Sequence, residues 1–382
     1  MRYKGNGDHN VDVDQNIVSD LSGFYQHRNM LQIRSTKIRG PQLSIMTYNI
    51  RTQCPKRRYR DGDGSCYADQ RYAVLAHEIG SYDADIVCLQ EVEQAKMHNF
   101  KQRLSKLGYQ LVLSMHNSIN AMAICYKRDL FTDILWKIKH YEDSMLFSHS
   151  NNPDSHRALL LCLGFKDEFL ENRFRPSKGG LIIANTHLPA DTHLRLKKTE
   201  QTAALLDYIS EFSKQCAADY GVSDCYTFLA GDFNSTPNDD AYMALVSKPF
   251  HFDATNTGDP SHLLKIETSH NDIPLRAVSL YSAGYHLVHP KNSNINNLRG
   301  EPHFSFWGPD FQGLLDFIFV VCPWDGNDYT KADSVDELHL YSQVKLLGLL
   351  RMPRDKEMIG FLPQVGAYPS DHLCMMADVE LL

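Results

Sequence analysis

The sequence predicts one large α/β domain in which sheet packs on sheet and helices cover the outside. Short apolar runs of strand length alternate with stretches of helical spacing in the first half of the chain, and strand-rich stretches recur later. No internal repeat or long low-complexity linker divides the chain. Short strands that are apolar throughout fit sheets covered on both faces. We therefore expect a loosely ordered tail over residues 1–40 and one folded domain over residues 41–382.

The first half of the chain contains four predicted strands and two predicted helices. The strands are apolar runs, at residues 43–50, 85–92, 109–115 and 121–127. One helix covers residues 71–84, because Ala73, Ala76 and Ile79 recur at helical spacing. A second helix contains Phe100, Leu104 and Leu107, and we expect a short helix in the tail around Phe24–Leu31.

The second half of the chain adds five predicted strands, at residues 157–165, 180–188, 226–234, 314–322 and 373–381. Residues 197–216 have the pattern of an amphipathic helix, and residues 241–247 begin another. Residues 247–310 are predicted to be rich in loops, with an exposed insertion at 289–300. Residues 325–337 are predicted to form an acidic loop.

Composition limits the class of protein and its compartment. The 382 residues carry a net charge of −7, which argues against a large basic face for duplex DNA. The nine cysteines include no CxxC pair, and several lie in apolar runs, which favours buried free thiols in a reducing compartment. The polar N-terminus and the lack of a long apolar stretch predict no membrane association. We expect an intracellular protein, cytoplasmic or nuclear and even nucleolar, with the mitochondrion as an open alternative.

Six of the apolar strands carry polar side chains near one end, as in FLAGDFNSTPND at residues 228–239. These side chains are Asn49, Glu91, His187, Asp232 with Asn234, Asp316, and Asp371 with His372. A buried carboxylate without a partner costs several kcal/mol, so these groups are expected to meet. Taken singly, each has an ordinary structural explanation, such as an Asp in a turn. Their joint occurrence predicts a shared pocket.

The predicted pocket has the composition of a metal-assisted phosphoesterase. Oxygen ligands without cysteine select Mg²⁺ or Mn²⁺ over zinc. The histidines and amides remain to hold a tetrahedral anion and to move protons. An acidic protein can bind phosphate esters in this way, because the metal ion brings the positive charge.

The motifs MTYNI, DIVCLQEV, NTHL, GDFNSTP, LLDFIF and YPSDHL, between residues 46 and 372, resemble the endonuclease/exonuclease/phosphatase superfamily, which has the DNase I-like fold. Spellings such as LQEVE and GDFNSTPND are similar to the deadenylase branch with nocturnin and Angel, and most similar to the fungal Ngl RNA exonucleases. The resemblance implies a four-layer α/β sandwich, two packed mixed sheets flanked by helices, with residues 41–382 as the catalytic domain.

The resemblance also implies the reaction. It indicates a Mg²⁺-dependent 3′→5′ exonuclease that acts on single-stranded RNA 3′ ends and releases 5′-nucleotides, in mRNA tail shortening or RNA 3′ trimming. One or two Mg²⁺ ions are implied, and Mn²⁺ is expected to substitute. Glu91 would be the principal metal ligand with Asn49 beside it, and Asp316 would lie near a second metal or support a histidine.

The remaining roles follow from the same resemblance. Asp232 would orient or deprotonate the attacking water, and Asn234 would hold the phosphate or the nucleophile. His187 would donate to phosphoryl oxygens, and Asp371 would fix the tautomer of His372 against the phosphate. Phe311, in PDFQG, stands where enzymes of this branch stack a ring on a base. Independently of the resemblance, the basic cluster at residues 193–198 near a site loop predicts that Arg195 or Lys197 contacts phosphates, with a solvated surface as the alternative.

Two departures leave the substrate open. Phe306 stands where poly(A) enzymes usually have Asn, and Thr192 stands where they have a proline, so strict adenine preference is in doubt. The leucine-rich repeat of one deadenylase subclass is absent, so docking to a large deadenylase complex is not expected, and the oligomeric state stays open. Alternative functions are a phosphatase or phosphodiesterase acting on a small nucleotide or a cyclic-phosphate RNA end, a non-catalytic RNA-binding protein, and, with less support, an abasic-site endonuclease.

Overall fold

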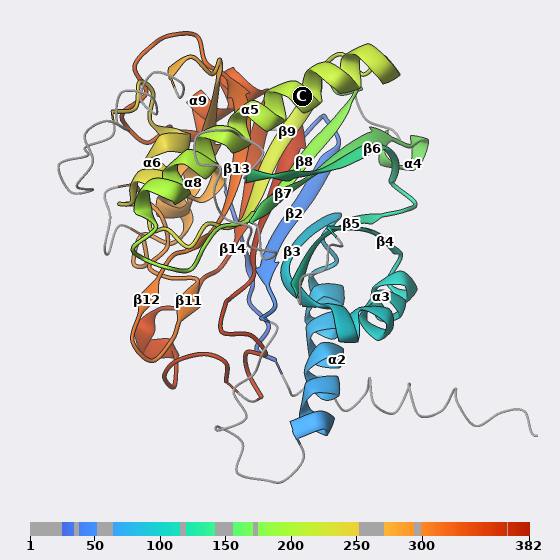
Figure 1. Cartoon of the computed structure of the whole chain (residues 1–382), viewed down its shortest axis with the longest axis vertical. Helices are drawn as coiled ribbons and strands as arrows, with labels where there is room; N and C mark the ends of the chain where they lie inside the picture. Colours follow the sequence, from blue (N-terminus) through green and yellow to red (C-terminus); the bar gives the residue numbers. More distant parts are fainter. Residues whose placement is uncertain are drawn as a thin grey trace, which may run out of the picture.

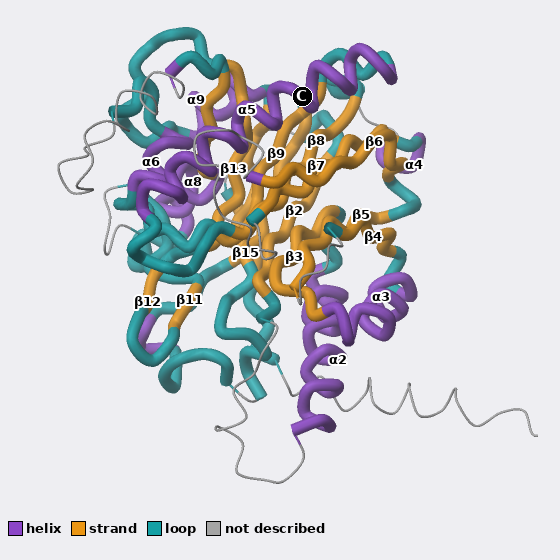
Figure 2. The backbone as a smooth tube through the Cα atoms, in the orientation of Figure 1, coloured by secondary structure: helices purple, strands orange, loops and turns teal. Residues whose placement is uncertain are grey.

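Two mixed β-sheets form the centre of the molecule (Figures 1 and 2). The computed structural model describes residues 25–33, 38–51, 64–114, 120–141, 156–170, 175–251, 271–293, 299–364 and 366–382, with only the backbone for 64–70. Within these ranges one sheet has seven strands, in the order β1 (Met30–Gln32), β14 (Val344–Leu350), β15 (Met375–Leu381), β2 (Gln42–Asn49), β3 (Ile86–Glu93), β5 (Asn120–Lys127) and β4 (Tyr109–Leu113).

The second large sheet has six strands among the described residues. Their order is β10 (Leu275–Ser279), β13 (Asp316–Pro323), β9 (Cys225–Asp232), β8 (Gly180–His187), β7 (Arg157–Phe165) and β6 (Phe131–His140). β2 and β3 run parallel, as do β8 and β9, and the other described neighbours in both sheets are antiparallel. A small hairpin pairs β11 (Phe306–Trp307) with β12 (Gln312–Gly313).

Helices cover the outer faces of the two sheets, which confirms the predicted four-layer α/β sandwich. α2 (Gly64–Tyr82) and α3 (Met97–Lys106) pack on the seven-stranded sheet, and α5 (Arg195–Tyr220) and α6 (Asp240–Val246) pack on the other. α8 (Leu280–Val288) and α9 (Val335–Ser342) contact both β13 and β14, and α4 (Asp167–Leu170) is a single turn. In the described part of the chain no helix is long and apolar enough to cross a membrane.

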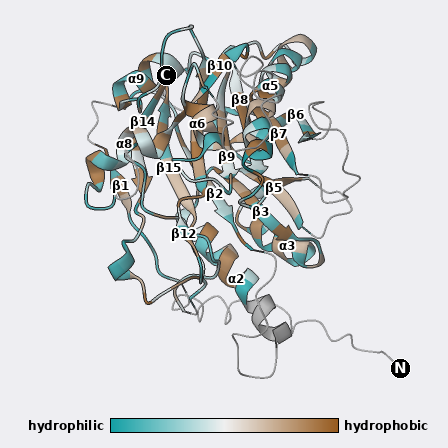
Figure 3. Ribbon diagram, turned by 60° about the vertical axis from the view of Figure 1, so that its left-hand side comes forward, coloured by the Kyte–Doolittle hydropathy of each residue, from teal (hydrophilic) through white to brown (hydrophobic). Residues whose placement is uncertain are grey.

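Both faces of the central strands are buried, which explains their continuous apolar runs (Figure 3). In β2, Ile45 points into the core between the sheets, whereas Met46 and Tyr48 point into the outer core under α2 and α3. Strands β2 and β9 pack face to face across the inner core. The seven cysteines whose side chains are described are buried and free, as expected, while Cys54 lies outside the described residues and Cys66 is described by its backbone alone.

The N-terminal segment differs from the expected tail. β1 pairs antiparallel with β14, with Met30 opposite Leu350, so the helix expected around Phe24–Leu31 is wrong for its described residues. Arg28 is only 3% exposed and donates hydrogen bonds into the folded domain. The ordered structure therefore starts before residue 41, and residues 1–24 and 34–37 of the predicted tail lie outside the described residues.

Several elements were not predicted from the sequence. β6, β14, β10 and α8 lie where no element was expected, and the last two fall inside the predicted loop-rich region. In the predicted exposed insertion, Asn292 and Ser293 are buried, and residues 294–298 lie outside the described residues. The acidic loop ends in α9, where Ser334 and Glu337 form a capping box, a signal that the letters SVDE carried.

Candidate active site

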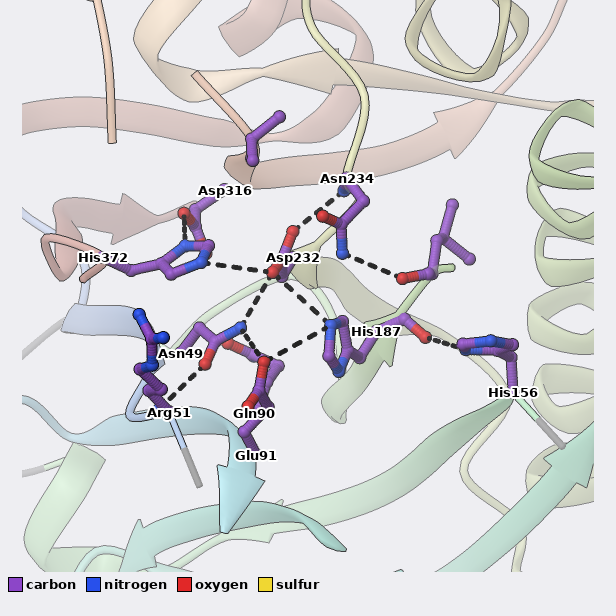
Figure 4. A network of polar contacts seen from close by, with 12 residues as sticks. Asn49, Arg51, Gln90, Glu91, His156, His187, Asp232, Asn234, Asp316 and His372 are labelled. Carbon is purple, nitrogen blue, oxygen red and sulfur yellow. Dashed lines mark hydrogen bonds and ion pairs between the residues drawn. The ribbon is translucent and has the colours of Figure 1, made fainter. Parts of the chain in front are cut away.

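The ends of strands from both sheets bring the predicted polar residues together (Figure 4). His187 ends β8 and lies opposite Asp232, which ends β9, and Asp232 lies opposite Asp316, the first residue of β13. Asn49 ends β2 in the facing sheet. Because β2 packs against β9 and β13, these four side chains meet at one edge of the sandwich.

Glu91 reaches the site through a β-bulge. The pairing of β3 with β5 shifts between Leu89 and Val92, so that an extra residue is accommodated in β3. Glu91 itself has a φ of 55°, which is unusual for a residue with a side chain. A bulge re-aims a side chain relative to a regular strand. The Glu91 carboxylate consequently faces the cavity of the site.

The conformation of the turn after β9 explains why the sequence has Gly231 and Asn234 on either side of Asp232 and Phe233. Gly231 has a φ of 152°, and a Cβ there would lie 2.1 Å from the Thr186 carbonyl oxygen, so glycine lets β8 and β9 approach. Asn234 has a φ of 44°, and its backbone N–H donates to Asp232 Oδ1 at 2.8 Å. Its side-chain amide donates to the Leu188 carbonyl at 2.9 Å, and Lys198 Nζ donates to the Asn234 carbonyl at 2.6 Å.

Asp232 is the centre of the polar network. Asn49 Nδ2 donates to Asp232 Oδ2 at 2.8 Å and lies 3.2 Å from Glu91 Oε1. His187 Nε2 lies 3.5 Å from Asp232 Oδ2 and 4.0 Å from Glu91 Oε1. Asp232 is fully buried, and this burial, with a smaller contribution from the charge of Asp316, raises the pKa of its carboxyl.

His372 lies between two buried carboxylates. Its Nδ1 is 2.7 Å from Asp316 Oδ2, and its Nε2 is 3.7 Å from Asp232 Oδ2. Burial alone would lower the pKa of His372, but the charges of Asp316 and Asp232 outweigh that effect and raise it to about 10. His372 is therefore an imidazolium at neutral pH. Ser305 Oγ donates to Asp316 Oδ2 at 2.7 Å and holds this carboxylate in place.

The role expected for Asp371 is corrected by the structure. The carboxylate that orients His372 is Asp316, which contacts Nδ1, whereas Asp371 forms an ion pair with Arg51. Arg51 was not singled out from the sequence. The reason is geometric, since Asp316 enters the pocket from β13 beside the ring of His372 (Figure 4). Asp371 instead pairs with Arg51, which follows β2.

Comparison with known proteins identifies the family. The model of the Endonuclease/Exonuclease/phosphatase family matches residues 46–372. The chain belongs to this family. RNA exonuclease NGL2 of Saccharomyces cerevisiae is 30% identical to it, over 90% of this chain and 79% of that protein. This relative confirms the resemblance that the motifs indicated.

Two solved structures support the same fold. The structure of ANGEL2, described as a 2′,3′-cyclic phosphatase in complex with adenosine-2′,3′-vanadate, covers 93% of this chain and 99% of its own with a TM-score of 0.65 at 20% identity. The human nocturnin catalytic domain with bound sulfate covers 93% of this chain and 97% of its own, with a TM-score of 0.56 at 18% identity. At these identities the likeness concerns the fold.

Enzymes of this family depend on a metal ion, and the site offers two places where acidic groups gather. Asp232, Asp316 and His372 bring ligand-type atoms within 4.8 Å of one another. A histidine must be neutral to bind a metal, and the raised pKa of His372 opposes this. The group of Glu91 and Asp232, with Asn49 beside both, fits a cation better, because these two carboxylates line the cavity and carboxylate oxygens are the ligands that Mg²⁺ prefers.

A cavity of about 1130 Å³ surrounds these groups. Glu91, His187, Asp232, Asn234, Asp371 and His372 line it, together with the predicted substrate residues Phe311 and Arg195. Phe311 is 46% exposed, and its ring lies 6.1 Å from that of Phe306, with 28° between the planes. The guanidinium of Arg195 forms an ion pair with Asp240, so its charge is partly compensated. Phosphate binding by Arg195 stays a prediction.

Among the residues of the site that were not predicted from the sequence are Arg51, Lys198, Ser305 and His156. Burial lowers the pKa of His156 to about 4, and its Nδ1 lies 3.2 Å from the His187 carbonyl. Lys198 could have been found, since it shares the buried face of α5 with Gln201 and Thr202 at helical spacing. Arg51 and Ser305 carry no such signal, because their partners are remote in the sequence.

Proposed function

We propose that this protein is a Mg²⁺-dependent 3′→5′ RNA exonuclease that releases 5′-nucleotides from single-stranded RNA ends. The observation that carries the proposal is the convergence of Glu91, Asp232 and the His372–Asp316 pair at one cavity. Such a set can hold a divalent cation, accept a proton and donate one to a phosphate. The relative named RNA exonuclease supports RNA as the substrate class, and the motif spellings support the 3′→5′ direction.

In the proposed reaction, water attacks phosphorus and the bond to the 3′ oxygen of the preceding nucleotide breaks. Asp232 takes the proton of the attacking water, and its raised pKa makes it a better base than an exposed aspartate. The leaving 3′ oxygen takes up a proton from solvent, so the products are a nucleoside 5′-monophosphate and an RNA with a new 3′-hydroxyl. The His372 imidazolium, oriented by Asp316, donates a hydrogen bond to the phosphate as negative charge develops.

The other polar groups position the phosphate. His187 is close enough to Asp232 and Glu91 for its Nε2 to reach the same phosphate. Asn234 contributes an amide with two hydrogens, one of which holds the Leu188 carbonyl. Glu91 and Asn49 would hold Mg²⁺, which when bound polarises the phosphoryl oxygens and the attacking water. Asp316 is assigned here to His372 rather than to a second metal.

The aromatic side of the cavity supports recognition of a base by stacking. Phe311 lies over Gly313, where a Cβ would come within 2.6 Å of the ring, so the missing side chain makes room for it. The exposed ring of Phe311 offers a flat surface beside the phosphate-handling groups. Stacking on such a ring tolerates every base. With Phe306 as its neighbour, we propose that the site accepts tails other than poly(A).

The experiment is digestion of 5′-labelled RNAs that carry 3′ tails of A, U, G or C, with Mg²⁺ and with EDTA. We expect stepwise shortening that needs Mg²⁺, with nucleoside 5′-monophosphates as products. The same reactions include RNA ending in a 2′,3′-cyclic phosphate and free nucleotides. Two outcomes without shortening of the RNA would contradict the exonuclease proposal: release of inorganic phosphate from nucleotides, or hydrolysis of the 2′,3′-cyclic phosphate. Either would favour the phosphatase alternative, which the fold neighbour ANGEL2 brings into consideration.

A further inference from the structure

The turn after β2 is built to present Arg51 to the active site. Arg51 has a φ of 47°, and its backbone N–H donates to Asn49 Oδ1 at 3.0 Å. The buried Arg71 of α2 fixes this turn, because its guanidinium donates to the Ile50 carbonyl at 2.5 Å and to the Arg51 carbonyl at 2.6 Å. A residue with a side chain keeps a positive φ when its surroundings hold it there.

The guanidinium of Arg51 lies against Asp371 at the wall of the cavity. The Arg51 side chain, which Figure 4 shows near Asn49 and His372, is 29% exposed. That of Asp371 is 9% exposed, and both residues line the cavity with Asp232 and His372. Among the described groups, Asp371 Oδ1 is buried without a hydrogen-bond partner. This carboxylate is thus held by a cation that itself stands beside the reacting groups.

We propose that Arg51 binds the substrate phosphate and that Asp371 is the positioning residue that holds Arg51 for this task. The inference rests on the proposed function and adds a residue to its phosphate site. A guanidinium has five N–H donors in a fixed plane, so it can hold a carboxylate on one edge and a phosphate oxygen on another. The ion pair restricts the side chain in advance, which lowers the entropy that phosphate binding costs.

The carboxylates of the cavity oppose the entry of a phosphate, and Arg51 adds to the positive groups that offset them. Four carboxylates, those of Glu91, Asp232, Asp316 and Asp371, face or adjoin the space that a phosphate must enter. Three further cations line the cavity, Arg157, Arg195 and Lys198. Lys198 donates to the Asn234 carbonyl and Arg195 pairs with Asp240, whereas Arg51 pairs with the residue that precedes His372. Arg51 is close to His372 through Asp371, the neighbouring residue in the chain, so it stands where the anion would be received.

The test is a double-mutant cycle with Arg51→Met, Asp371→Asn and the combined variant, assayed on single-stranded RNA with Mg²⁺. We expect Arg51→Met to lose about tenfold or more in kcat/KM, because hydrogen bonds to a charged group are lost. Arg51→Lys should lie between Arg51→Met and the wild type. Arg128→Met is the matched control, since Arg128 is 54% exposed, is paired with Asp129 and lies outside the cavity lining.

The combined variant decides between the possible roles. If Asp371 acts through Arg51, the combined variant matches Arg51→Met within about twofold. Recovery of wild-type activity in the combined variant would show that Arg51 only neutralises Asp371, and would overturn the proposal. A combined variant far below Arg51→Met would show that Asp371 acts independently, on His372 or on a metal, and would also overturn it.

A binding measurement separates this inference from the proposed function. Inorganic phosphate should raise the melting temperature of the wild-type protein and of Arg128→Met, but not that of Arg51→Met. If RNA is not shortened and phosphate still stabilises the protein through Arg51, the exonuclease proposal fails and the inference stands. If phosphate fails to stabilise the wild type, or stabilises Arg51→Met equally, the inference is wrong.

Discussion

Two buried polar clusters lie on opposite faces of the seven-stranded sheet, and β2 contributes to both. Asn49 points into the active site, whereas Tyr48, the preceding residue, points under α2. There its hydroxyl donates to Glu78 Oε2 at 2.9 Å, and Arg28 Nη2 donates to the Cys374 carbonyl at 2.7 Å. We call Arg28, Tyr48, Glu78 and Cys374 the enclosed cluster, because none of its members lines the cavity.

The comparison shows which property distinguishes a site from a structural network. Burial raises the pKa of Glu78 in the enclosed cluster, just as it raises the pKa of Asp232 in the active site. A shifted pKa therefore does not separate the two. The difference lies in access to the cavity, since Glu91, Asp232 and Asp371 line it. Glu78 does not line the cavity, and both of its carboxylate oxygens have protein partners.

The largest expected effect is the loss of catalysis in Asp232→Asn. Removing the proposed base should lower kcat by about 10³-fold. The melting temperature should be retained, because an amide is cheaper to bury than a carboxylate whose pKa burial already raises. The measurements are RNA shortening and thermal unfolding of the same preparation. Full activity in Asp232→Asn would place the chemistry elsewhere.

Arg28→Met should lower stability and leave catalysis unchanged, the opposite of Asp232→Asn. Removing one charge from the enclosed cluster should lower the free energy of unfolding by about 3–5 kcal/mol, because Glu78 loses its neighbouring cation. The activity per folded molecule should not change. Urea unfolding measures the first effect, with Arg354→Met, a partly exposed arginine paired with Glu357, as the matched control. Equal stability of the two variants would mean that the enclosed cluster is not a structural element.

A smaller effect is expected on the titration of His372 in Asp316→Asn. The charges of Asp316 and Asp232 raise the pKa of His372 to about 10. Protonated His372 therefore contributes fully to the free energy of unfolding below about pH 6.5, the ordinary pKa of histidine. This contribution is lost as the pH rises through about 10. Without Asp316, the pKa should fall and this loss should begin at lower pH.

NMR titration of His372 in EDTA, beside pH-dependent unfolding, measures the change. Asp333→Asn is the control, because Asp333 pairs with the buried Arg276 away from the cavity. An unchanged pKa of His372 in Asp316→Asn would refute the assignment of Asp316 as its partner.

The smallest effect is expected for Phe311, the exposed aromatic residue of the cavity lining. Phe311→Ala should weaken RNA binding by about 1–3 kcal/mol, the usual contribution of one stacked base, for tails of any base. Phe361→Ala is the control, since Phe361 is 44% exposed but does not line the cavity. Equal affinity of the two variants in fluorescence anisotropy would exclude Phe311 as a stacking surface.

The sequence predicted the strands that carry the site because an apolar run followed by a polar residue is a local signal. β2, β8 and β9 were placed within a residue or two at each end, and their ends hold Asn49, His187 and Asp232. β6 was not predicted, since Phe131–His140 is mostly part-exposed and mixes charged with apolar residues. β14 reads VKLLGLL, and a short apolar run of this kind does not distinguish strand from helix until β15 pairs with it.

Side-chain pairings within the site could not be predicted, because they depend on three-dimensional approach. The resemblance paired Asp371 with His372 and left Asp316 to a second metal or to a histidine, whereas in the structure it is Asp316 that contacts His372. Arg51 and Asp371 are separated by 320 positions. The bulge that directs Glu91 into the cavity could likewise not be predicted from the sequence LQEVE, because it depends on the register between β3 and β5.

The most direct test of the central claim is an anomalous diffraction map of crystals grown with Mn²⁺. If polar strand ends form a metal and phosphate centre, a Mn²⁺ peak will lie against the Glu91 carboxylate in the cavity, and the enclosed cluster around Glu78 will have none. A map with no peak beside Glu91, or with Mn²⁺ bound only at other acidic residues, would contradict it.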